Sequence, residues 1–463
     1  MNITQLSYAD VAGGAEQVAS DLHRAYRDQG QNATLFVGTR HEDTLSDCYP
    51  LPHDRYRSPG AQRLVRKAPS VTAAQSSKSA LLKRRTLYTL VDPLQAARKA
   101  LGYDDRSFPA SHHILELTTA APDVCHLHNP SHFFDLRALP ALSRRVPLVI
   151  TAHDLWMGTG RCAYPLDCQK WRTGCGNCPH RDYPPVAPFD RTRQAWRAKS
   201  ALYNRSLLYL ASPASWALRN LEQSIMAAGV QEARVIPNGV DQSIFHPAPQ
   251  EDERRRLRER LGLRPDDFAI AYTALSVGNP YKDPETLSKA LDLLAPSGSR
   301  ITLIQMGAAE DSCARENTIT RKTIAFSSRR EDLAAVLQAC DLYAHSARAE
   351  VAPLAILEAE SCGLPVVASD VGGIRECVAR DGEVREGALL APASDPRALA
   401  EAIGRYLADP ARTRAIGAEV ARWAAGRFSH LRMAERYLSY YEEAQRSFAQ
   451  RRVRQGVQIA GGY

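Results

Sequence analysis

The chain has 463 residues, of which 44% are hydrophobic and 24% charged, and its formal net charge is +8. These fractions are typical of a soluble globular protein, and no apolar run approaches the roughly 20 residues of a membrane-spanning helix, which excludes a helical integral membrane protein. The length predicts two domains, because single hydrophobic cores stop growing beyond about 250–300 residues.

Apolar, β-rich runs alternate with amphipathic helical patterns along the whole chain. Six runs lie in the first half, from NITQLSY to ARVIPNGV, and six in the second half, from FAIAYTAL to GALLAP. Strand–helix alternation predicts parallel sheets covered on both faces. Twelve strands are too many for one doubly wound sheet, so we predict two Rossmann-like domains. A closed (β/α)8 barrel is disfavoured by the length and by a break rich in Pro, Asn and Gly at residues 236–249.

This break, IPNGVDQSIFHPAP, is the expected interdomain hinge. It places an N-terminal domain at residues 1–236 and a C-terminal domain at 237–427, followed by a C-terminal amphipathic helix and tail at 428–463 that crosses the domain junction. The N-terminal domain is expected to carry a basic insertion at about residues 50–110 and a Cys-rich insertion at 160–182.

The N-terminal stretch MNITQLSYAD is the first expected strand. It has neither the basic head nor the apolar segment of a secretory signal, so we expect the protein to start at Met1 and to stay in the cytoplasm.

Gly13 and Gly14 follow this first strand and precede a helix that begins near Ala15. Glycines let a backbone approach a ligand closely, and a helix N-terminus favours an anion. A plain strand-to-helix turn is the alternative, and it is the preferred interpretation of this pattern taken by itself.

Part of the excess positive charge lies between residues 55 and 99, in RYRSPGAQRLVRK and SKSALLKRRTLYTL. One interpretation is a solvated surface insertion. The other is attraction to an anionic surface, either lipid or nucleic acid. Aromatic residues for base stacking are sparse there and no nucleic-acid motif is present. Of the two anionic partners we therefore predict the inner face of the cell membrane, and no nucleic acid.

Histidines end two successive expected strands. His126 and His128 alternate with apolar residues in VCHLHN, and His128 is the last strand residue before a turn; His153 ends the next strand in TAHD, beside Asp154. Ligands of open α/β sheets bind at the carboxyl ends of strands. A structural histidine remains the alternative at each position. We expect His128 near the ligand, and His153 and Asp154 on the acceptor side.

The segment GRCAYPLDCQKWRTGCGNCPH contains four of the ten cysteines. Cys175 and Cys178 have the C-x2-C spacing of a zinc knuckle, whereas Cys162 and Cys168 are spaced too widely for a second one. A structural zinc site with all four cysteines as ligands is the leading hypothesis, and two disulfides or free thiols are the alternatives. The other six are expected to be small buried residues in a reducing compartment: Cys48, Cys125, Cys313, Cys340, Cys362 and Cys377.

In the second half, Lys282 lies in a Pro-bounded loop between an expected strand and a helix, where a lysine can neutralise a phosphate. An ordinary surface lysine is the alternative.

In AEVAPLAILEAESCGLPVVASDVGG, Pro353 suits a first helical turn and Gly363 a C-terminal cap, which predicts a helix over about residues 353–361. Glu350 lies just before this helix and Glu358 lies inside it, where a paired surface glutamate is the alternative to a sugar-binding carboxylate.

Five segments in this order resemble glycosyltransferase family 4: the Gly-Gly turn, VCHLH, IPNGVD, the E-x7-E pair and CGLPVVASDVGG. The resemblance covers most of the chain, is strongest over residues 340–378 and 234–241, and is weak over residues 40–120. It implies the GT-B fold, in which two Rossmann-like domains face each other across a cleft. It also implies retaining transfer of a sugar from a nucleotide sugar.

The resemblance assigns roles by position. Glu358 would bind the ribose hydroxyls, and Glu350 would lie by the donor sugar. Backbone N–H groups near Pro353 and Leu354, with Lys282, would hold the diphosphate. From the other domain, Gly14, with Gly13 in the same turn, would approach the donor, and His128 would contact the transferred sugar near its anomeric centre.

Two departures from the family pattern concern the phosphate site. The family arginine that precedes the lysine is missing from LSVGNPYK, so either Lys282 bears more of the charge or another residue, such as Arg348, replaces it. Val351-Ala352-Pro353 stands in place of the usual Gly-Phe-Gly, which remains compatible with a loop that enters a helix.

The resemblance implies that the acceptor hydroxyl attacks on the leaving-group face and that the departing phosphate takes its proton. No Asp-x-Asp pair follows a strand, so no metal or other cofactor is expected for catalysis. The expected reaction moves a hexose from a UDP- or GDP-linked donor to a lipid-linked or glycan acceptor in surface polysaccharide or glycoconjugate assembly. A nucleotide-sugar epimerase on the same fold and a degenerate sugar-nucleotide-binding protein are the alternatives.

Overall fold

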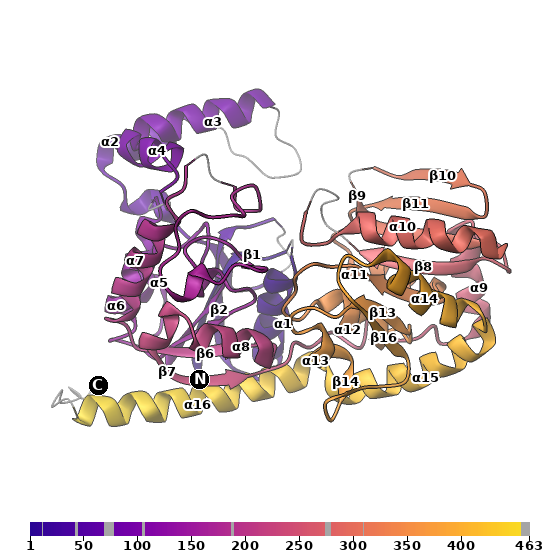
Figure 1. Ribbon diagram of the computed structural model, residues 1–463. Coiled ribbons are helices and arrows are strands. Elements are labelled where there is room, and N and C mark those ends of the chain that lie inside the picture. The colour runs from indigo at the N-terminus through magenta and orange to yellow at the C-terminus, as the bar shows by residue number, and fades with distance from the viewer. Residues whose placement is uncertain are drawn as a thin grey trace. The chain divides into compact units, whose positions relative to one another are not determined.

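A computed structural model describes residues 1–11, 13–41, 45–68, 78–103, 107–186, 189–273, 279–308 and 310–454 of the chain. The chain forms two compact units, each with its own β-sheet (Figure 1). Unit 1 comprises Met1–Ser212, Ala217–Ile236 and the chain from Ala434 onward, and unit 2 comprises Pro213–Trp216 and Pro237–Met433. Within the described residues, no helix has the length and apolar character needed to cross a membrane.

The sheet of unit 1 has seven strands in the order β3-β2-β1-β4-β5-β6-β7, and every neighbouring pair is parallel. All residues of β4, β5 and β6 are buried, as expected for parallel strands covered on both faces. The strands are β1 (Asn2–Ala9), β2 (Asn32–Thr39), β3 (Cys48–Pro50), β4 (Val124–His128), β5 (Leu148–Thr151), β6 (Leu208–Ser212) and β7 (Val230–Val235).

The helices of the first half include α1, which follows β1 directly, and three helices that contact one another in series, α2, α3 and α4 (Figure 1). Their bounds are α1 (Gly14–Asp28), α2 (Pro59–Val65), α3 (Lys78–Val91), α4 (Pro93–Ala100), α5 (Ile114–Leu117), α6 (Leu139–Leu142), α7 (Thr192–Tyr203) and α8 (Ser215–Glu222). The described part of the predicted basic insertion is thus largely helical.

The sheet of unit 2 also has seven strands, in the order β10-β11-β9-β8-β12-β13-β16. All its pairs are parallel except β10, which runs antiparallel to β11 at one edge. The strands are β8 (Phe268–Thr273), β9 (Ile301–Ala308), β10 (Ser312–Glu316), β11 (Ile319–Ala325), β12 (Leu342–His345), β13 (Val366–Ser369) and β16 (Ala388–Ala391). A short hairpin is formed by β14 (Ala379–Arg380) and β15 (Glu383–Val384).

Seven helices follow the strands and loops of unit 2 within the described residues: α9 (Glu251–Arg260), α10 (Pro284–Leu294), α11 (Arg330–Ala339), α12 (Leu354–Ser361), α13 (Ile374–Val378), α14 (Pro396–Leu407) and α15 (Pro410–Arg427). The main core of unit 2 is formed by buried side chains of the strands with α10 and α14, including Ile270, Leu291 and Ile403. The prediction of two Rossmann-like domains is confirmed by these two sheets, with β10 as the antiparallel exception.

The last helix, α16 (His430–Arg454), belongs to both units. Its first residues up to Met433 are part of unit 2, and the rest belongs to unit 1 (Figure 1). Tyr437, Tyr441 and Phe448 are buried at spacings of four and seven residues, which is the helical period of one face. The prediction of an amphipathic helix in this region is therefore confirmed.

The order of the strands defines one switch point in each sheet, where the chain turns to build the sheet in the opposite direction. In unit 1 the switch point lies between β1 and β4, and in unit 2 between β8 and β12. Ligands of open α/β sheets bind at the carboxyl ends of the strands at such points. Gly13 follows β1 and His128 ends β4. Lys282 follows β8 and Glu350 follows β12.

The burial prediction for the scattered cysteines is right for five and wrong for one. Cys48, Cys125, Cys340, Cys362 and Cys377 are buried, whereas Cys313 is exposed. Cys313 lies on β10, whose five residues are all exposed because this strand is the outer, antiparallel edge of its sheet.

Candidate functional site

At the switch point of unit 2, the structure brings Lys282 and Glu350 together. Lys282 follows β8, Glu350 follows β12, and the Lys282 ammonium forms an ion pair with Oε1 of Glu350. Glu350 is only 7% exposed. The two residues are 68 positions apart in sequence, and they meet because β8 and β12 are neighbours in the sheet. Residues 275–278 of LSVGNPYK, where the family arginine is missing, lie outside the described residues.

A series of polar side chains extends from the Glu350 carboxylate along β12 to β8. His345, the last residue of β12, has Nε2 3.4 Å from Oε1 of Glu350. Its Nδ1 lies 3.3 Å from the hydroxyl of Tyr343, which is 2.6 Å from the hydroxyl of Thr273. Burial by itself would raise the pKa of Glu350, but Lys282 and His345 outweigh it and lower this pKa to about 2. Glu350 is therefore a fixed, ionised acceptor at neutral pH.

The backbone of Glu350 is fixed by the Gly-Gly turn at the end of CGLPVVASDVGG. Gly372 has φ +59, and a Cβ atom there would lie 1.8 Å from the carbonyl oxygen of Glu350. A Cβ atom on Gly373 would lie 2.2 Å from the carbonyl oxygen of Val351, and the N–H of Gly373 donates to the carbonyl of Glu350 at 3.2 Å. Only glycine at these two positions permits this close approach.

The E-x7-E segment has the predicted local structure. Helix α12 begins at Leu354 after Pro353 as N-cap residue and ends before Gly363, which has φ +83. Glu358 is 7% exposed, so the alternative of a surface glutamate is wrong. Nη2 of Arg330, on α11, lies 3.9 Å from Oε1 of Glu358. The helix N-terminus after Pro353 leaves the backbone N–H groups of Leu354 and Ala355 without intrahelical carbonyl partners, and these favour an anion.

Arg348, the suggested substitute for the missing arginine, is engaged with a carboxylate. Its Nη2 donates to Oδ1 of Asp283 at 3.2 Å, and its Nε lies 3.1 Å from Oδ2. Burial would raise the pKa of Asp283, but Arg348 and neighbouring hydroxyls lower it. Asp283 precedes α10 in the left-handed conformation, with φ +45. This pair therefore fixes the loop that carries Lys282, and neither Lys282 nor Arg348 has its charge unpaired.

At the switch point of unit 1, His128 is buried between polar side chains. Its Nδ1 lies 3.2 Å from Nε2 of His153, and its Nε2 lies 3.4 Å from the side-chain nitrogen of Gln5 on β1. An amide N–H can only donate, so His128 accepts at Nε2 and donates from Nδ1 to His153. Burial lowers the pKa of His128 well below its usual value and that of His153 to about 4. Both rings are therefore neutral at pH 7.

His126 is a structural residue in the core of unit 1. Its Nε2 lies 2.7 Å from the hydroxyl of Thr151 and its Nδ1 lies 2.6 Å from the hydroxyl of Tyr441 on α16. Its ring also contacts that of His128, with 4.0 Å between centroids. His126 therefore has a structural role beneath His128, in agreement with the structural alternative for this position.

Two further predicted residues lie next to these strands. Asp154 follows His153, accepts from the side-chain amide of Asn129 at 3.2 Å and from the Trp156 N–H at 2.8 Å, and has its pKa raised to about 6 by burial. Gly13 is the N-cap residue of α1, with extended backbone, and a Cβ atom there would lie 2.5 Å from a carboxylate oxygen of Glu16. Gly14 is the first residue of α1.

Several residues that complete these arrangements were not singled out in the sequence. They are Gln5, Asn129, Thr273, Asp283, Tyr343 and His345. Asn129 directly follows His128 and could have been found from that position. The others depend on which strands are neighbours, and no local pattern carries that information.

The four clustered cysteines are all free thiols in the loop between β5 and α7. Among the described residues, no group of three or more His, Cys, Asp or Glu side chains has the arrangement of a metal site. The zinc hypothesis therefore stays a prediction at this point.

Comparison with known proteins gives two matches to family models. The model described as Glycosyltransferase Family 4 matches residues 12–243, and the one described as Glycosyl transferases group 1 matches residues 270–409. Both models describe transferases, so a nucleotide-sugar epimerase is not favoured.

Individual proteins are similar over the whole chain or over half of it. WcaC of Escherichia coli (strain K12), whose name connects it with colanic acid biosynthesis as a glycosyl transferase, is 26% identical over 462 residues, covering 96% of this chain and 100% of WcaC. The D-inositol 3-phosphate glycosyltransferase of Kineococcus radiotolerans is 36% identical over 231 residues, covering 45% of this chain and 51% of that protein.

Among solved structures, the crystal structure of HepE from Anabaena in complex with UDP-glucose has a similar fold. Its TM-score is 0.59 at 19% identity, and the match covers 96% of this chain and 100% of HepE. At this level of identity the likeness concerns the fold alone.

Proposed function

This chain belongs to glycosyltransferase family 4, and from that premise we propose that it is a retaining hexosyltransferase of surface polysaccharide or glycoconjugate assembly. The donor is a UDP- or GDP-linked hexose, and the acceptor is a hydroxyl of a lipid-linked or glycan molecule. The name of WcaC, which matches over its full length, supports polysaccharide assembly. The observation that carries the proposal is the Lys282–Glu350 pair at the switch point of unit 2, next to the N-terminus of α12.

The proposed donor site uses the polar groups of unit 2. Glu358 accepts hydrogen bonds from the ribose hydroxyls, and the backbone N–H groups that follow Pro353, beginning with that of Leu354, bind the diphosphate. Because Lys282 is already paired with Glu350, the diphosphate oxygens compete with this carboxylate for the ammonium group. Glu350, kept ionised by Lys282 and His345, accepts hydrogen bonds from the hydroxyls of the donor sugar.

From unit 1, His128 contacts the transferred sugar, and Gly13 and Gly14 let the α1 N-terminus approach the donor. His153 and Asp154 lie on the acceptor side. The leaving group is a nucleoside diphosphate, and fixed dipoles and cations that stabilise its growing charge lower the barrier. Burial lowers the pKa of His128 well below its usual value, which makes its ring a weak base, so we propose that the departing phosphate, not this ring, takes the proton of the acceptor hydroxyl. No metal or other cofactor is required in this mechanism.

A thermal-shift screen across nucleotide sugars tests the donor proposal. One UDP- or GDP-hexose is expected to raise the melting temperature, because a ligand at 100 times its Kd stabilises the folded state by about 2.7 kcal/mol. Lys282→Met is expected to weaken this shift, and Lys289→Met, which changes an exposed lysine paired with Glu285, is the matched control. A screen in which no nucleotide sugar changes the melting temperature of the wild type would contradict the proposal.

We also propose that the basic insertion binds the anionic inner face of the cell membrane. On α3, Lys83 and Arg85 are exposed next to Leu82, which is 65% exposed, and Leu90, which is 60% exposed. Leu94 on α4 is 73% exposed. Basic side chains next to exposed leucines suit an anionic lipid surface, where each cation contributes about 1 kcal/mol.

Vesicle sedimentation tests this membrane contact. The protein is expected to sediment with phosphatidylglycerol vesicles at low salt and to be released at high salt, because ions screen surface charges. Lys83→Glu/Arg85→Glu should abolish sedimentation, whereas Arg422→Glu on an exposed face of α15 should leave it unchanged. Equal binding to neutral phosphatidylcholine vesicles, or none to either kind, would refute the contact.

A further inference from the structure

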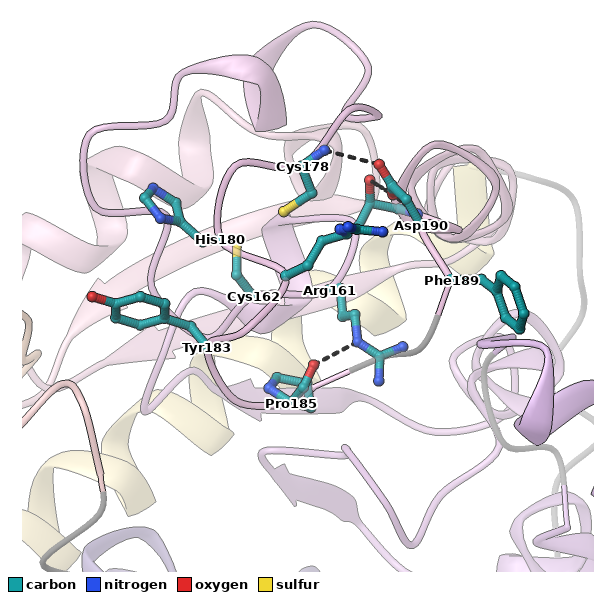
Figure 2. A pocket seen from close by; sticks show the side chains of 10 residues that line it. Arg161, Cys162, Cys178, His180, Tyr183, Pro185, Phe189 and Asp190 are labelled. Carbon is teal, nitrogen blue, oxygen red and sulfur yellow. Dashed lines mark hydrogen bonds between the residues drawn. The ribbon is translucent and has the colours of Figure 1, made fainter.

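The Cys-rich loop between β5 and α7 has no part in the proposed transfer reaction, yet its fold brings distant segments together. Cys162 and Cys168 lie early in the loop, and Cys175 and Cys178 lie in the CGNC turn. The ten described residues that line one small pocket, drawn in Figure 2, include Cys162 and Cys178. In that view the two sulfur atoms point toward the same space.

Cys175 is held against the segment that carries Cys162. A Cβ atom on Gly160 would lie 3.1 Å from Sγ of Cys175 and 2.3 Å from the carbonyl oxygen of Thr192. The N–H of Gly176 donates to the hydroxyl of Thr192 at 2.9 Å. The backbone two residues before Cys162 therefore lies directly beside the Cys175 sulfur, and only glycine at position 160 leaves the space for it.

Cys168 and Cys178 are linked through their neighbours. Nε2 of His180 lies 2.6 Å from Oδ1 of Asp167, the residue before Cys168. The backbone N–H of Cys178 donates to Oδ2 of Asp190 at 2.8 Å. These contacts hold the two ends of the loop together independently of the Gly160 contact.

The CGNC turn has an unusual backbone. Cys175, Gly176 and Asn177 have φ values of 47, 95 and 47, so three successive residues are in the left-handed region. Two of them are not glycine, and such a conformation persists only where the surroundings impose it.

Two basic side chains lie next to the clustered cysteines. Lys170 donates to the carbonyl of Asn177 at 2.8 Å, and Arg161 lines the pocket.

We propose that Cys162, Cys168, Cys175 and Cys178 bind one structural Zn²⁺ ion. Four cysteines with a C-x2-C turn are the donor set of a closed tetrahedral zinc site, and thiolates select zinc over hard cations such as Mg²⁺. The four thiols release four protons to solvent on binding. Because no three of the described side chains are yet arranged as a finished site, the sulfur atoms draw together when the ion binds. The site fixes the loop that follows His153 and Asp154 without taking part in transfer.

Metal analysis of the full-length protein tests the proposal without reference to transfer activity. Protein purified under reducing conditions is expected to contain one zinc ion per chain by mass spectrometry of the elements. Cys175→Ser and Cys178→Ser are expected to lose nearly all of it. Cys313→Ser is the matched control, because Cys313 is exposed on β10 of unit 2, and this variant should keep its zinc.

A second measurement separates loss of ligands from loss of folding. Titration of the wild type with a mercurial reagent, with a colorimetric zinc chelator present, is expected to release the ion as the four thiols react. Zinc-free wild-type protein whose clustered thiols react freely in the native state would overturn the proposal. A mass of the intact protein that is four hydrogen atoms below that of the reduced chain would indicate two disulfides, and this result would also overturn the proposal.

Discussion

Replacement of Glu350 by alanine is expected to slow sugar transfer by about two to three orders of magnitude, the usual effect of removing one preorganised electrostatic group from an active site. The carboxylate is buried, ionised and held by Lys282 and His345, and the backbone of Glu350 packs against Gly372. Its loss leaves the ammonium group of Lys282 without its partner and removes an acceptor for the donor sugar. The rate of label transfer from a nucleotide sugar measures the effect.

Two further variants test whether the effect is specific to the ionised Glu350 carboxylate. Glu401→Ala, on an exposed position of α14, is expected to transfer at the wild-type rate. Because Lys282 and His345 outweigh burial and lower the pKa of Glu350 to about 2, Glu350 stays ionised down to strongly acidic pH in the wild type. In Lys282→Met this pKa rises, so the acid limb of the pH–rate profile is expected to move to higher pH. Wild-type transfer by Glu350→Ala would refute the assignment.

The largest loss of stability is expected for Arg385→Ala. The Arg385 guanidinium forms an ion pair with Glu360 on α12, whose side chain is 0% exposed, and lies over the ring of Trp423, 4.2 Å from its centroid. Removal of one partner of a buried pair leaves an uncompensated charge and typically costs about 3–5 kcal/mol. Urea unfolding at a pH above about 8, where Glu360 is ionised in the folded wild type, measures this free energy. Because α12 also carries Glu358, weaker donor binding should accompany the loss.

The pH dependence of stability and two comparison variants test whether loss of the Glu360–Arg385 pair causes the instability of Arg385→Ala. Burial raises the pKa of Glu360 to about 8 although Arg385 lowers it, so this pKa rises further in Arg385→Ala. The added instability of the variant is therefore largest at alkaline pH, where Glu360 is ionised in the folded wild type, and it shrinks as the pH falls below about 8. Glu360→Leu/Arg385→Met should recover much of the loss. Arg412→Ala, from an exposed pair with Glu386, should cost about 1 kcal/mol or less. An equal loss in both single variants would contradict this account.

The strands were predictable because burial on both faces gives parallel strands continuous apolar runs. All twelve runs singled out in the sequence form strands. The strands missed are short or exposed: β3 has three residues, β14 and β15 have two each, and β10 is exposed throughout. An exposed edge strand such as SCARE has no apolar run to reveal it, which also explains the wrong prediction for Cys313.

The positions of the site residues were predictable, but their partners were not. Gly13, His128, Lys282 and Glu350 follow or end strands, and local sequence shows this. The Lys282–Glu350 and Arg348–Asp283 pairs join residues 68 and 65 positions apart, and they depend on β8 and β12 being neighbours. The contact of His126 with Tyr441 spans 315 positions. Strand order determines the two ion pairs, and the packing of α16 against the sheet of unit 1 determines the contact of His126; local pattern shows neither.

The protein is expected to transfer a hexose from a nucleotide sugar, with Glu350 at the donor site. The most direct test is incubation of the purified protein with labelled UDP- and GDP-hexoses and a bacterial membrane extract, followed by analysis of the product and its anomeric configuration. Label is expected in a lipid-linked or glycan product with the configuration of the donor, and it is expected to be lost in Glu350→Ala. Donor binding without transfer, or an epimerised nucleotide sugar without a transfer product, would contradict this expectation.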